Sequence, residues 1–280
     1  MTRVRAPAKI NLCLYLGPRR PDGRHELVTL FDAVTLFDEL EIVQGTRDEI
    51  VCEGVDGPNL VGDAVAALRD AGWEGPPMRV TITKRIPVAA GMGGGSADAA
   101  AVLRWAPHPS AHRIAAELGA DVPGQLEPGP LLGTGTGADL AAVPAPPSYA
   151  VVILPQPFPL STADVYREAD RLGLARPAAE LESLRSRLGA AFDPALVVND
   201  LQPAALSLAP VIQPALGAAL EAGADQAIVC GSGPTVIGLF WGAEGGSRAR
   251  EAADRLREAF PAAVAADPFR GGDRAATANE

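Results

Sequence analysis

The most informative stretch of the chain is Lys84-Arg-Ile-Pro-Val-Ala-Ala-Gly91-Met-Gly93-Gly94-Gly95-Ser96-Ala-Asp98-Ala-Ala. The residues around its start, Arg79 to Ile86, alternate and are rich in β-branched side chains, which predicts a strand. From Ala97 to Trp105 the chain is rich in alanine, which predicts a helix. A strand, a glycine loop and a helix N-terminus in this order form an anion-binding cradle, because glycines let the backbone approach a ligand and the helix dipole adds positive charge. The stretch therefore predicts a phosphate site.

This glycine loop differs from the two best-known phosphate-binding loops. No Gly-Lys-Ser/Thr follows it, so it is not a Walker A loop. Ser96 stands where a dinucleotide-binding fingerprint has its third glycine, and a helix and several strands precede the loop. An ordinary turn is the alternative that a glycine cluster by itself leaves open.

Outward from this loop, strands and helices follow one another in both halves of the chain, which predicts an α+β protein. We expect strands at Arg3–Leu16, Val34–Val43, Glu49–Glu53, Tyr149–Leu154, Ala227–Cys230 and Thr235–Phe240. We expect helices at Asn59–Ala71, Ile114–Leu118, Thr162–Leu172, Ala178–Leu188, Ala204–Glu221 and Arg248–Phe260. The proline-rich segment Val143–Ser148 is typical of a linker and predicts two lobes, residues 1–146 and 147–270, followed by a disordered polar tail, residues 271–280.

The charge balance limits the partners of the chain. Asp and Glu number 34 against 24 Lys and Arg, which gives a net charge of −10. A chain this acidic has no general attraction to nucleic acid or to an anionic membrane. No apolar run reaches the roughly 18 residues of a membrane span. The N-terminus lacks the apolar core of a signal peptide, so we expect a cytoplasmic protein.

Soft metal ligands are few and badly spaced. Cys13, Cys52 and Cys230 form no CxxC pair, which argues against a disulfide framework and a cysteine-based zinc site. His108 and His112 stand four residues apart, but the prolines beside His108 favour a solvated loop over a metal site. We therefore assign no side chains as metal ligands.

Lysine is rare in this chain. Of the 24 basic residues only Lys9 and Lys84 are lysines, and the rest are arginines. Either these two positions need a compact, titratable ammonium that a planar guanidinium cannot replace, or the lysines are retained by chance on the surface. The composition leaves both interpretations open.

Three segments, in order, resemble the motifs of the GHMP kinases, the family of galacto-, homoserine, mevalonate and phosphomevalonate kinases. They are Ala6-Pro-Ala-Lys9-Ile-Asn11-Leu, the central Pro87–Ala97 phosphate motif and Cys230-Gly-Ser-Gly-Pro-Thr235. The resemblance implies a two-lobed fold with an N-terminal lobe like ribosomal protein S5 and a C-terminal ferredoxin-like lobe. It also implies ATP as phosphoryl donor, with Mg²⁺.

Further segments resemble the GHMP kinases that act on 4-diphosphocytidyl-2-C-methyl-D-erythritol. These segments are Arg20-Pro-Asp-Gly-Arg-His-Glu26, Asn59-Leu, Gly119-Ala-Asp-Val-Pro123 and Asn199-Asp-Leu201. The resemblance implies phosphorylation of the 2-hydroxyl of the methylerythritol unit in the non-mevalonate isoprenoid pathway. It implies a small-molecule partner with a cytidine diphosphate group, and we expect a monomer or weak homodimer.

The resemblance also implies roles for individual residues. Asp121 would accept the proton of the acceptor hydroxyl, and Lys9 would orient that hydroxyl and stabilise developing negative charge. The alternatives are a helix or turn cap for Asp121 and a surface charge at the end of a strand for Lys9. Matching positions for ATP are Asn59, Lys84, Pro87, Ala89, Ala90, Gly91, Met92, Gly93, Gly94, Gly95, Ser96 and Ala97. Those for the acceptor are Asn11, Arg24, His25, Tyr166, Gly231, Ser232 and Gly233, with His25 reading the cytosine edge and Tyr166 stacking on the ring, unless it is an ordinary half-buried aromatic.

The chain departs from the family pattern at several positions. Arg24 replaces a tyrosine, Gly124-Gln125 replaces an aromatic pair, Ala97 replaces a common serine and the stretch Trp105–His112 is short. Two other functions remain possible at this point. A GHMP kinase for mevalonate-type or sugar acceptors is disfavoured by the Asp22–Glu26 segment, and a degenerate nucleotide-binding module requires loss of Lys9 or Asp121, which are both present.

Overall fold

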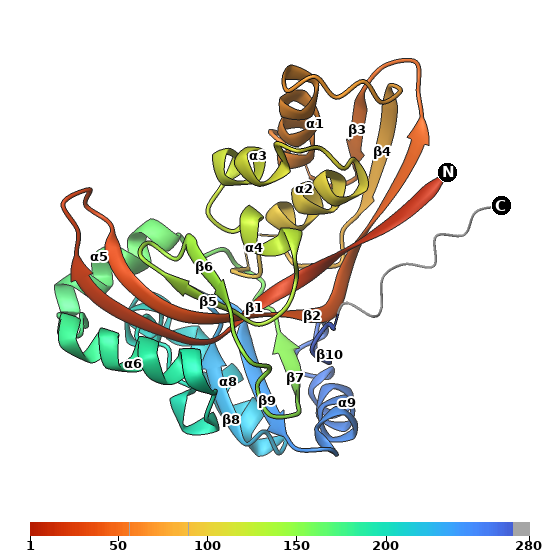
Figure 1. Cartoon of the computed structure of the whole chain (residues 1–280). Helices are drawn as coiled ribbons and strands as arrows, with labels where there is room; N and C mark the ends of the chain where they lie inside the picture. The colour runs from red at the N-terminus through yellow and green to blue at the C-terminus, as the bar shows by residue number, and fades with distance from the viewer. Residues whose placement is uncertain (56, 89, 271–280) are drawn as a thin grey trace.

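A six-stranded sheet forms the first half of the computed structural model, which describes residues 1–55, 57–88 and 90–270. Its strands are β1 (Thr2–Arg19), β2 (His25–Gln44), β3 (Glu49–Cys52), β4 (Met78–Thr83), β5 (Leu131–Thr134) and β6 (Asp139–Ala142). The strand order is β3-β4-β2-β5-β6, with β1 paired to β2, and only the β3–β4 pairing is parallel. The long, curved β1 and β2 cross the middle of the molecule (Figure 1).

Four helices cover one side of the β3–β4 part of this sheet (Figure 1). They are α1 (Leu60–Asp70), α2 (Gly94–Trp105), α3 (Ala111–Leu118) and the short α4 (Val122–Leu126). Alanines from 97 to 101 are fully buried along α2, so their small side chains let this helix approach α1 and β1 closely.

The second sheet has four strands, β7 (Tyr149–Leu154), β8 (Gln226–Val229), β9 (Val236–Trp241) and β10 (Val264–Ala266). Its order is β10-β7-β9-β8 and all its pairings are antiparallel. The helices α5 (Thr162–Leu172), α6 (Ala178–Ala190), α7 (Gln202–Leu208) and α8 (Gln213–Glu221) lie between β7 and β8, and α9 (Gly245–Leu256) lies between β9 and β10. This order of strands and crossings is the ferredoxin-like arrangement that the resemblance implies.

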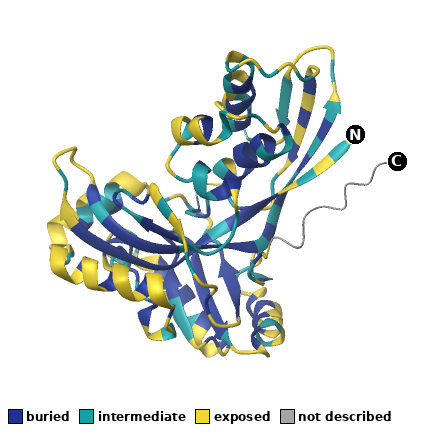
Figure 2. Cartoon of the chain, viewed as in Figure 1, coloured by how far each residue is buried: buried dark blue, intermediate teal, exposed yellow. Residues whose placement is uncertain are grey.

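The two sheets share one buried core. Ile10 and Leu30 of the first sheet belong to the same apolar cluster as Val151 and Leu239 of the second, and Leu184 of α6 joins them. Figure 2 shows this continuity, with β1, β2 and the second sheet buried while the outer faces of α5 and α6 are exposed. The segment 143–148 connects the sheets, and the lobe boundary at 146 and 147 stays a prediction.

The predicted helix Ala204–Glu221 is wrong. The structure breaks it into α7, a 3₁₀ turn at Pro210–Ile212 and α8. Pro210 has no N–H to donate and forces Ala209 out of the helical region, to φ −137° and ψ 76°. Among the described helices no single one is long and apolar enough to cross a membrane, although α7 and the segment 210–221 together meet that test across a 113° bend.

Most other elements lie where the pattern predicts, with shifted ends. Helix α2 begins at Gly94, three residues earlier than expected, because Gly93 adopts φ +67° and turns the chain into the helix. His112, expected in a loop, lies in the first turn of α3, while His108 precedes that helix. The first half of β2 and the elements α4, β5, β6 and β10 were not predicted. The expected tail, residues 271–280, lies outside the described residues.

Candidate active site

The glycine loop leads into α2, and the N-terminus of this helix has no side-chain cap. Gly93 is the N-cap residue and has no side chain to occupy the first N–H groups of the helix. The loop is held to the first strand by a hydrogen bond from the Lys9 N–H to the Met92 carbonyl, 3.0 Å. Free N–H groups at the positive end of a helix dipole attract an anion.

A cavity of about 890 Å³ opens in front of this helix end. It is lined by Cys52, Val55, Pro58, Asn59, Leu60, Lys84, Pro87, Val88, Ala90, Gly91, Met92, Gly93, Gly94, Gly95, Ser96 and Asp98. All of the predicted ATP residues line it except Ala97, which is buried inside α2, and Ala89, which lies outside the described residues. Asn59 also caps α1, because its Oδ1 accepts from the Val61 N–H at 2.9 Å.

Lys84 lies at the wall of this cavity, but its ammonium is bound by the protein. Nζ donates to Asp98 Oδ2 at 2.8 Å and to Asp38 Oδ2. Asp38 is fully buried, and its other oxygen accepts from the N–H groups of Arg85 and Ile86 at 2.6 and 2.8 Å. The Lys84–Asp38–Asp98 cluster therefore fixes the end of β4, where the chain enters the glycine loop, to β2 and α2.

The charges of this cluster are strongly coupled. Burial alone would lower the pKa of Lys84, but Asp98 and Asp38 together raise it above its usual range. Burial raises the pKa of Asp98 to about 7; Lys84 opposes this rise and Asp38 reinforces it. Neither acid was assigned a role from the sequence. Asp98 lies inside the quoted motif, whereas an isolated acid in a strand, such as Asp38, carries no local signal.

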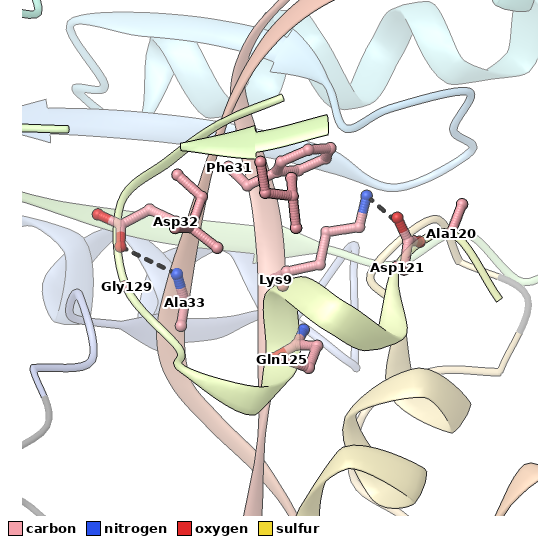
Figure 3. Close-up of a pocket in the computed structure, with 11 residues that line it drawn as sticks. Lys9, Phe31, Asp32, Ala33, Ala120, Asp121, Gln125 and Gly129 are labelled. Atoms are coloured by element: carbon pink, nitrogen blue, oxygen red, sulfur yellow. Dashed lines mark hydrogen bonds and ion pairs between the residues drawn. The ribbon is translucent and has the colours of Figure 1, made fainter. Parts of the chain in front are cut away.

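Lys9 and Asp121 face each other on the other side of the glycine loop. Lys9 Nζ lies 3.1 Å from Asn11 Oδ1, 3.8 Å from Asp121 Oδ2 and 4.7 Å from the centre of the Phe31 ring. Figure 3 shows the ammonium directed at the carboxylate. The Lys9 side chain is only 14% exposed, and Asp121 makes no capping hydrogen bond to α4. Lys9 is therefore not a surface charge, and Asp121, although it is the N-cap residue of α4, does not use its carboxylate to cap that helix.

A second cavity, of about 690 Å³, begins at this pair. It is lined by Lys9, Asn11, Leu14, Leu27, Thr29, Phe31, Gly91, Gly93, Ala120, Asp121, Thr136, Gly137, Thr162, Tyr166, Gly231 and Ser232. Gly91 and Gly93 border both cavities. The two cavities therefore meet at the glycine loop, beside Lys9 and Asp121.

Four of the predicted acceptor residues line this second cavity: Asn11, Tyr166, Gly231 and Ser232. Arg24, which is exposed, and His25 and Gly233, which are buried, do not line this cavity. Burial, with the charge of Asp121 adding, raises the pKa of Tyr166 to about 12, so its hydroxyl stays neutral at ordinary pH. Thr29 and Thr162 were missed, because isolated threonines carry no motif; Thr162 Oγ1 lies 2.8 Å from Ser232 Oγ.

His25 is buried beside this cavity, with its ring centre 5.8 Å from that of Tyr166. Its Nδ1 donates to the Gly17 carbonyl at 2.9 Å. Asp170 Oδ1 lies 2.9 Å from Nε2, but outside hydrogen-bonding geometry. Both ring nitrogens thus have a protein neighbour, and α5 supplies both Tyr166 and Asp170 to this corner.

Comparisons with known proteins agree with this arrangement. The GHMP kinases N terminal domain matches residues 59–127, and the GHMP kinases C terminal domain matches residues 176–262. A 4-diphosphocytidyl-2-C-methyl-D-erythritol kinase of Mycolicibacterium gilvum is 44% identical over 83% of this chain and 80% of its own length. The enzyme of the same name from Streptomyces avermitilis is 40% identical over 89% and 91%.

Solved structures show the same relationship. A crystal structure of 4-(cytidine 5′-diphospho)-2C-methyl-D-erythritol kinase superposes with a TM-score of 0.78 at 34% identity, over 96% of this chain and all of the other. A homoserine kinase from Cytophaga hutchinsonii shares only the fold, with a TM-score of 0.58 at 20% identity over 96% of this chain and 94% of its own.

Proposed function

The chain belongs to the GHMP kinases, in the family of 4-diphosphocytidyl-2-C-methyl-D-erythritol kinases, and from this premise we propose which residues carry the reaction. The protein is an ATP-dependent small-molecule kinase of isoprenoid biosynthesis. We propose that the acceptor group is the 2-hydroxyl of the methylerythritol unit. The observation that supports our assignment is the position of Lys9 and Asp121, at the border between the two cavities.

The first cavity binds ATP. Its triphosphate lies against the N–H groups at the start of α2, where the helix dipole is positive and glycines keep the approach open. The nucleoside then extends toward Asn59 and the wall that contains Lys84. Because the Lys84 ammonium already binds two carboxylates, its contribution to this wall is mainly to fix the loop.

The second cavity binds the acceptor. Its cytidine diphosphate end extends toward Tyr166 and the loop of Gly231 and Ser232, and its polyol end lies at Lys9. Asp121 accepts the proton of the acceptor hydroxyl as the oxygen attacks the γ-phosphoryl group. Lys9 holds that oxygen in line and neutralises negative charge as it develops, with Asn11 fixing the ammonium.

Mg²⁺ fits this site as an ion that binds together with ATP and is held mainly by the phosphates of ATP. Among the described residues no group of three His, Cys, Asp or Glu side chains could hold a metal by itself. Mg²⁺ commonly keeps several waters and is bound by substrate phosphates with few protein ligands, so a pre-formed cage is not required. When bound, it neutralises part of the phosphate charge.

The test is phosphoryl transfer from ATP to a set of acceptors: the cytidine diphosphate-linked methylerythritol, mevalonate, galactose and homoserine. We expect turnover with the cytidine-bearing acceptor alone. Faster turnover with mevalonate or a sugar would assign the chain to another GHMP activity. ATP binding without transfer to any acceptor would identify a nucleotide-binding module.

We also propose a monomer or weak homodimer and a cytoplasmic location. Few large apolar side chains are exposed on the described surface, namely Met1, Val88, Leu172, Leu208, Val211 and Leu220. The three cysteines are unpaired, as is usual in a reducing compartment. Light scattering at several concentrations tests the first proposal and cell fractionation the second.

A further inference from the structure

The loop between β8 and β9, residues 230–234, closely approaches β1, the strand that carries Lys9 and Asn11. A Cβ atom on Gly231 would lie 3.3 Å from Asn11 Oδ1, and Gly231 adopts φ +57°. Asn11 in turn binds the Lys9 ammonium, 3.1 Å away. The position of this loop therefore sets the width of the acceptor cavity next to the reacting groups.

One buried side chain holds this loop. Asn199, 6% exposed, donates from Nδ2 to the carbonyls of Val229 and Gly231, both at 2.7 Å. Its Oδ1 accepts from the Leu201 N–H at 2.9 Å, which fixes which end of the amide faces the loop. Both donors of the carboxamide are thus used, and each of them meets a backbone carbonyl.

The same segment is joined to the catalytic strand. The Leu14 N–H donates to the Val198 carbonyl at 2.8 Å, and the Asp200 N–H donates to the Leu14 carbonyl at 2.9 Å. These bonds form a parallel bridge between Leu14 and Asn199. Leu14 lies on β1, the strand that also carries Lys9 and Asn11. Asn199 therefore connects β1 to the 230–234 loop, in addition to the direct approach of Gly231 to Asn11.

We propose that Asn199 is a positioning residue for phosphoryl transfer, which sets the distance between the Gly231 loop and the Lys9–Asn11 end of β1 and thereby the fit of the acceptor. This inference rests on the proposed function of the second cavity. The proposed ATP cavity depends on it less, because residues 52–98 line it and the Lys84 cluster fixes the entry to the glycine loop. The 230–234 loop touches that wall at Gly91, where a Cβ atom would lie 2.9 Å from the Cys230 carbonyl oxygen.

The test compares Asn199→Asp with the control Asp200→Asn. Asn199→Asp keeps the shape but turns a carboxylate oxygen toward two carbonyl oxygens, so we expect the loop to move and the KM for the acceptor to rise roughly tenfold or more. The KM for ATP should change less than about threefold. Asp200→Asn weakens the pairing of this side chain with Arg176, whose Nε lies 2.6 Å from Oδ2 and whose Nη2 lies 2.7 Å from Oδ1. It keeps one oxygen that can accept from the Leu16 N–H of β1, 3.0 Å away, and it leaves the amide of Asn199 in place. It should lower the melting temperature and leave the KM for the acceptor unchanged.

A second variant covers the case in which Asn199→Asp does not fold. Asn199→Ser keeps one donor on a shorter side chain. It should also raise the KM for the acceptor more than the KM for ATP, but by a smaller factor than Asn199→Asp. An unchanged acceptor KM in either folded variant, or an equal loss of affinity for ATP and acceptor, would overturn the proposal. Failure of the wild-type chain to use the cytidine-bearing acceptor would instead contradict the proposed function.

Discussion

The two cavities on either side of the glycine loop are built in different ways. The proposed ATP cavity is lined by residues 52–98 alone, a single stretch of the first sheet and its helices. The acceptor cavity takes residues from β1, β2, α5, the segment 136–137 and the loop after β8, so it exists only when both halves of the chain are packed together. Nucleotide binding should therefore be a local property, whereas acceptor binding and transfer should depend on contacts between distant segments.

Asp121→Asn should give the largest difference between the loss of phosphoryl transfer and the loss of ATP binding. The amide keeps the size of the side chain but cannot take the acceptor proton, so kcat should fall by about 10²–10⁴-fold. ATP affinity should persist, because Asp121 does not line the ATP cavity. Steady-state kinetics and calorimetric titration with ATP measure the two effects. Turnover near that of the wild type would reduce Asp121 to a structural residue.

A smaller loss of kcat is expected from Lys9→Arg, which also changes the lining of the proposed acceptor cavity. The variant keeps the charge, but the forked guanidinium cannot occupy the space between Asn11, Asp121 and the Phe31 ring that the ammonium fills. An acceptor displaced by about an ångström should lose roughly 10²-fold in kcat. Melting curves control for folding. If Lys9→Arg turned over like the wild type, charge alone would suffice at this position and the geometric role would be excluded.

Next to the proposed ATP cavity, the Lys84–Asp38–Asp98 cluster should make the free energy of unfolding depend on pH. The pKa of Asp98 is raised from 3.8 to about 7, chiefly by burial, so between these values the folded chain holds a proton that the unfolded chain has lost. This contribution favours the folded state at low pH and is lost as the pH rises from 3.8 to about 7, by up to about 1.4 kcal/mol per pH unit.

Asp98→Asn should remove this slope, because the amide does not titrate. Urea unfolding at pH 5, 6, 7 and 8 compares the two proteins. The matched control is Asp63→Asn, which changes an acid in the first turn of α1 whose side chain takes no part in the cluster. Equal slopes for wild type and Asp98→Asn would show that Asp98 is ionised throughout this range.

The smallest expected effect is a gain in stability at Gln125. This side chain is 2% exposed, points into the small hollow behind Lys9, and neither of its amide atoms has a hydrogen-bond partner among the described residues (Figure 3). Gln125→Met has a similar length and removes two unsatisfied polar atoms, so we expect about 1 kcal/mol of added stability. Urea unfolding measures it, and a less stable variant would show that the amide is satisfied in solution.

Prediction from the sequence succeeded where the physical cause is local. Strand Tyr149–Leu154 and helix Thr162–Leu172 are confirmed with both ends as expected, because a continuous apolar run and a regular helical pattern are set by neighbouring residues. Pro210 is also a local signal, because proline breaks a helix, but the alanine-rich pattern on both sides of it predicts a continuous helix. Strand β5 carried no such signal, because its four residues become a strand only by pairing with β2 and β6.

By itself, the sequence determined the strand, the glycine loop and the helix N-terminus beside the proposed ATP cavity, since a backbone cradle depends on residues adjacent in the chain. It also marked Lys9 and Asp121, but only the tertiary structure brought their charged groups to 3.8 Å. The same holds for Lys84, whose two partners are 14 and 46 residues away, and for Asn199, which joins a loop 30 residues on to a strand far earlier in the chain. Contacts of this kind depend on how the two sheets pack over their shared core, and that packing is a property of the whole chain.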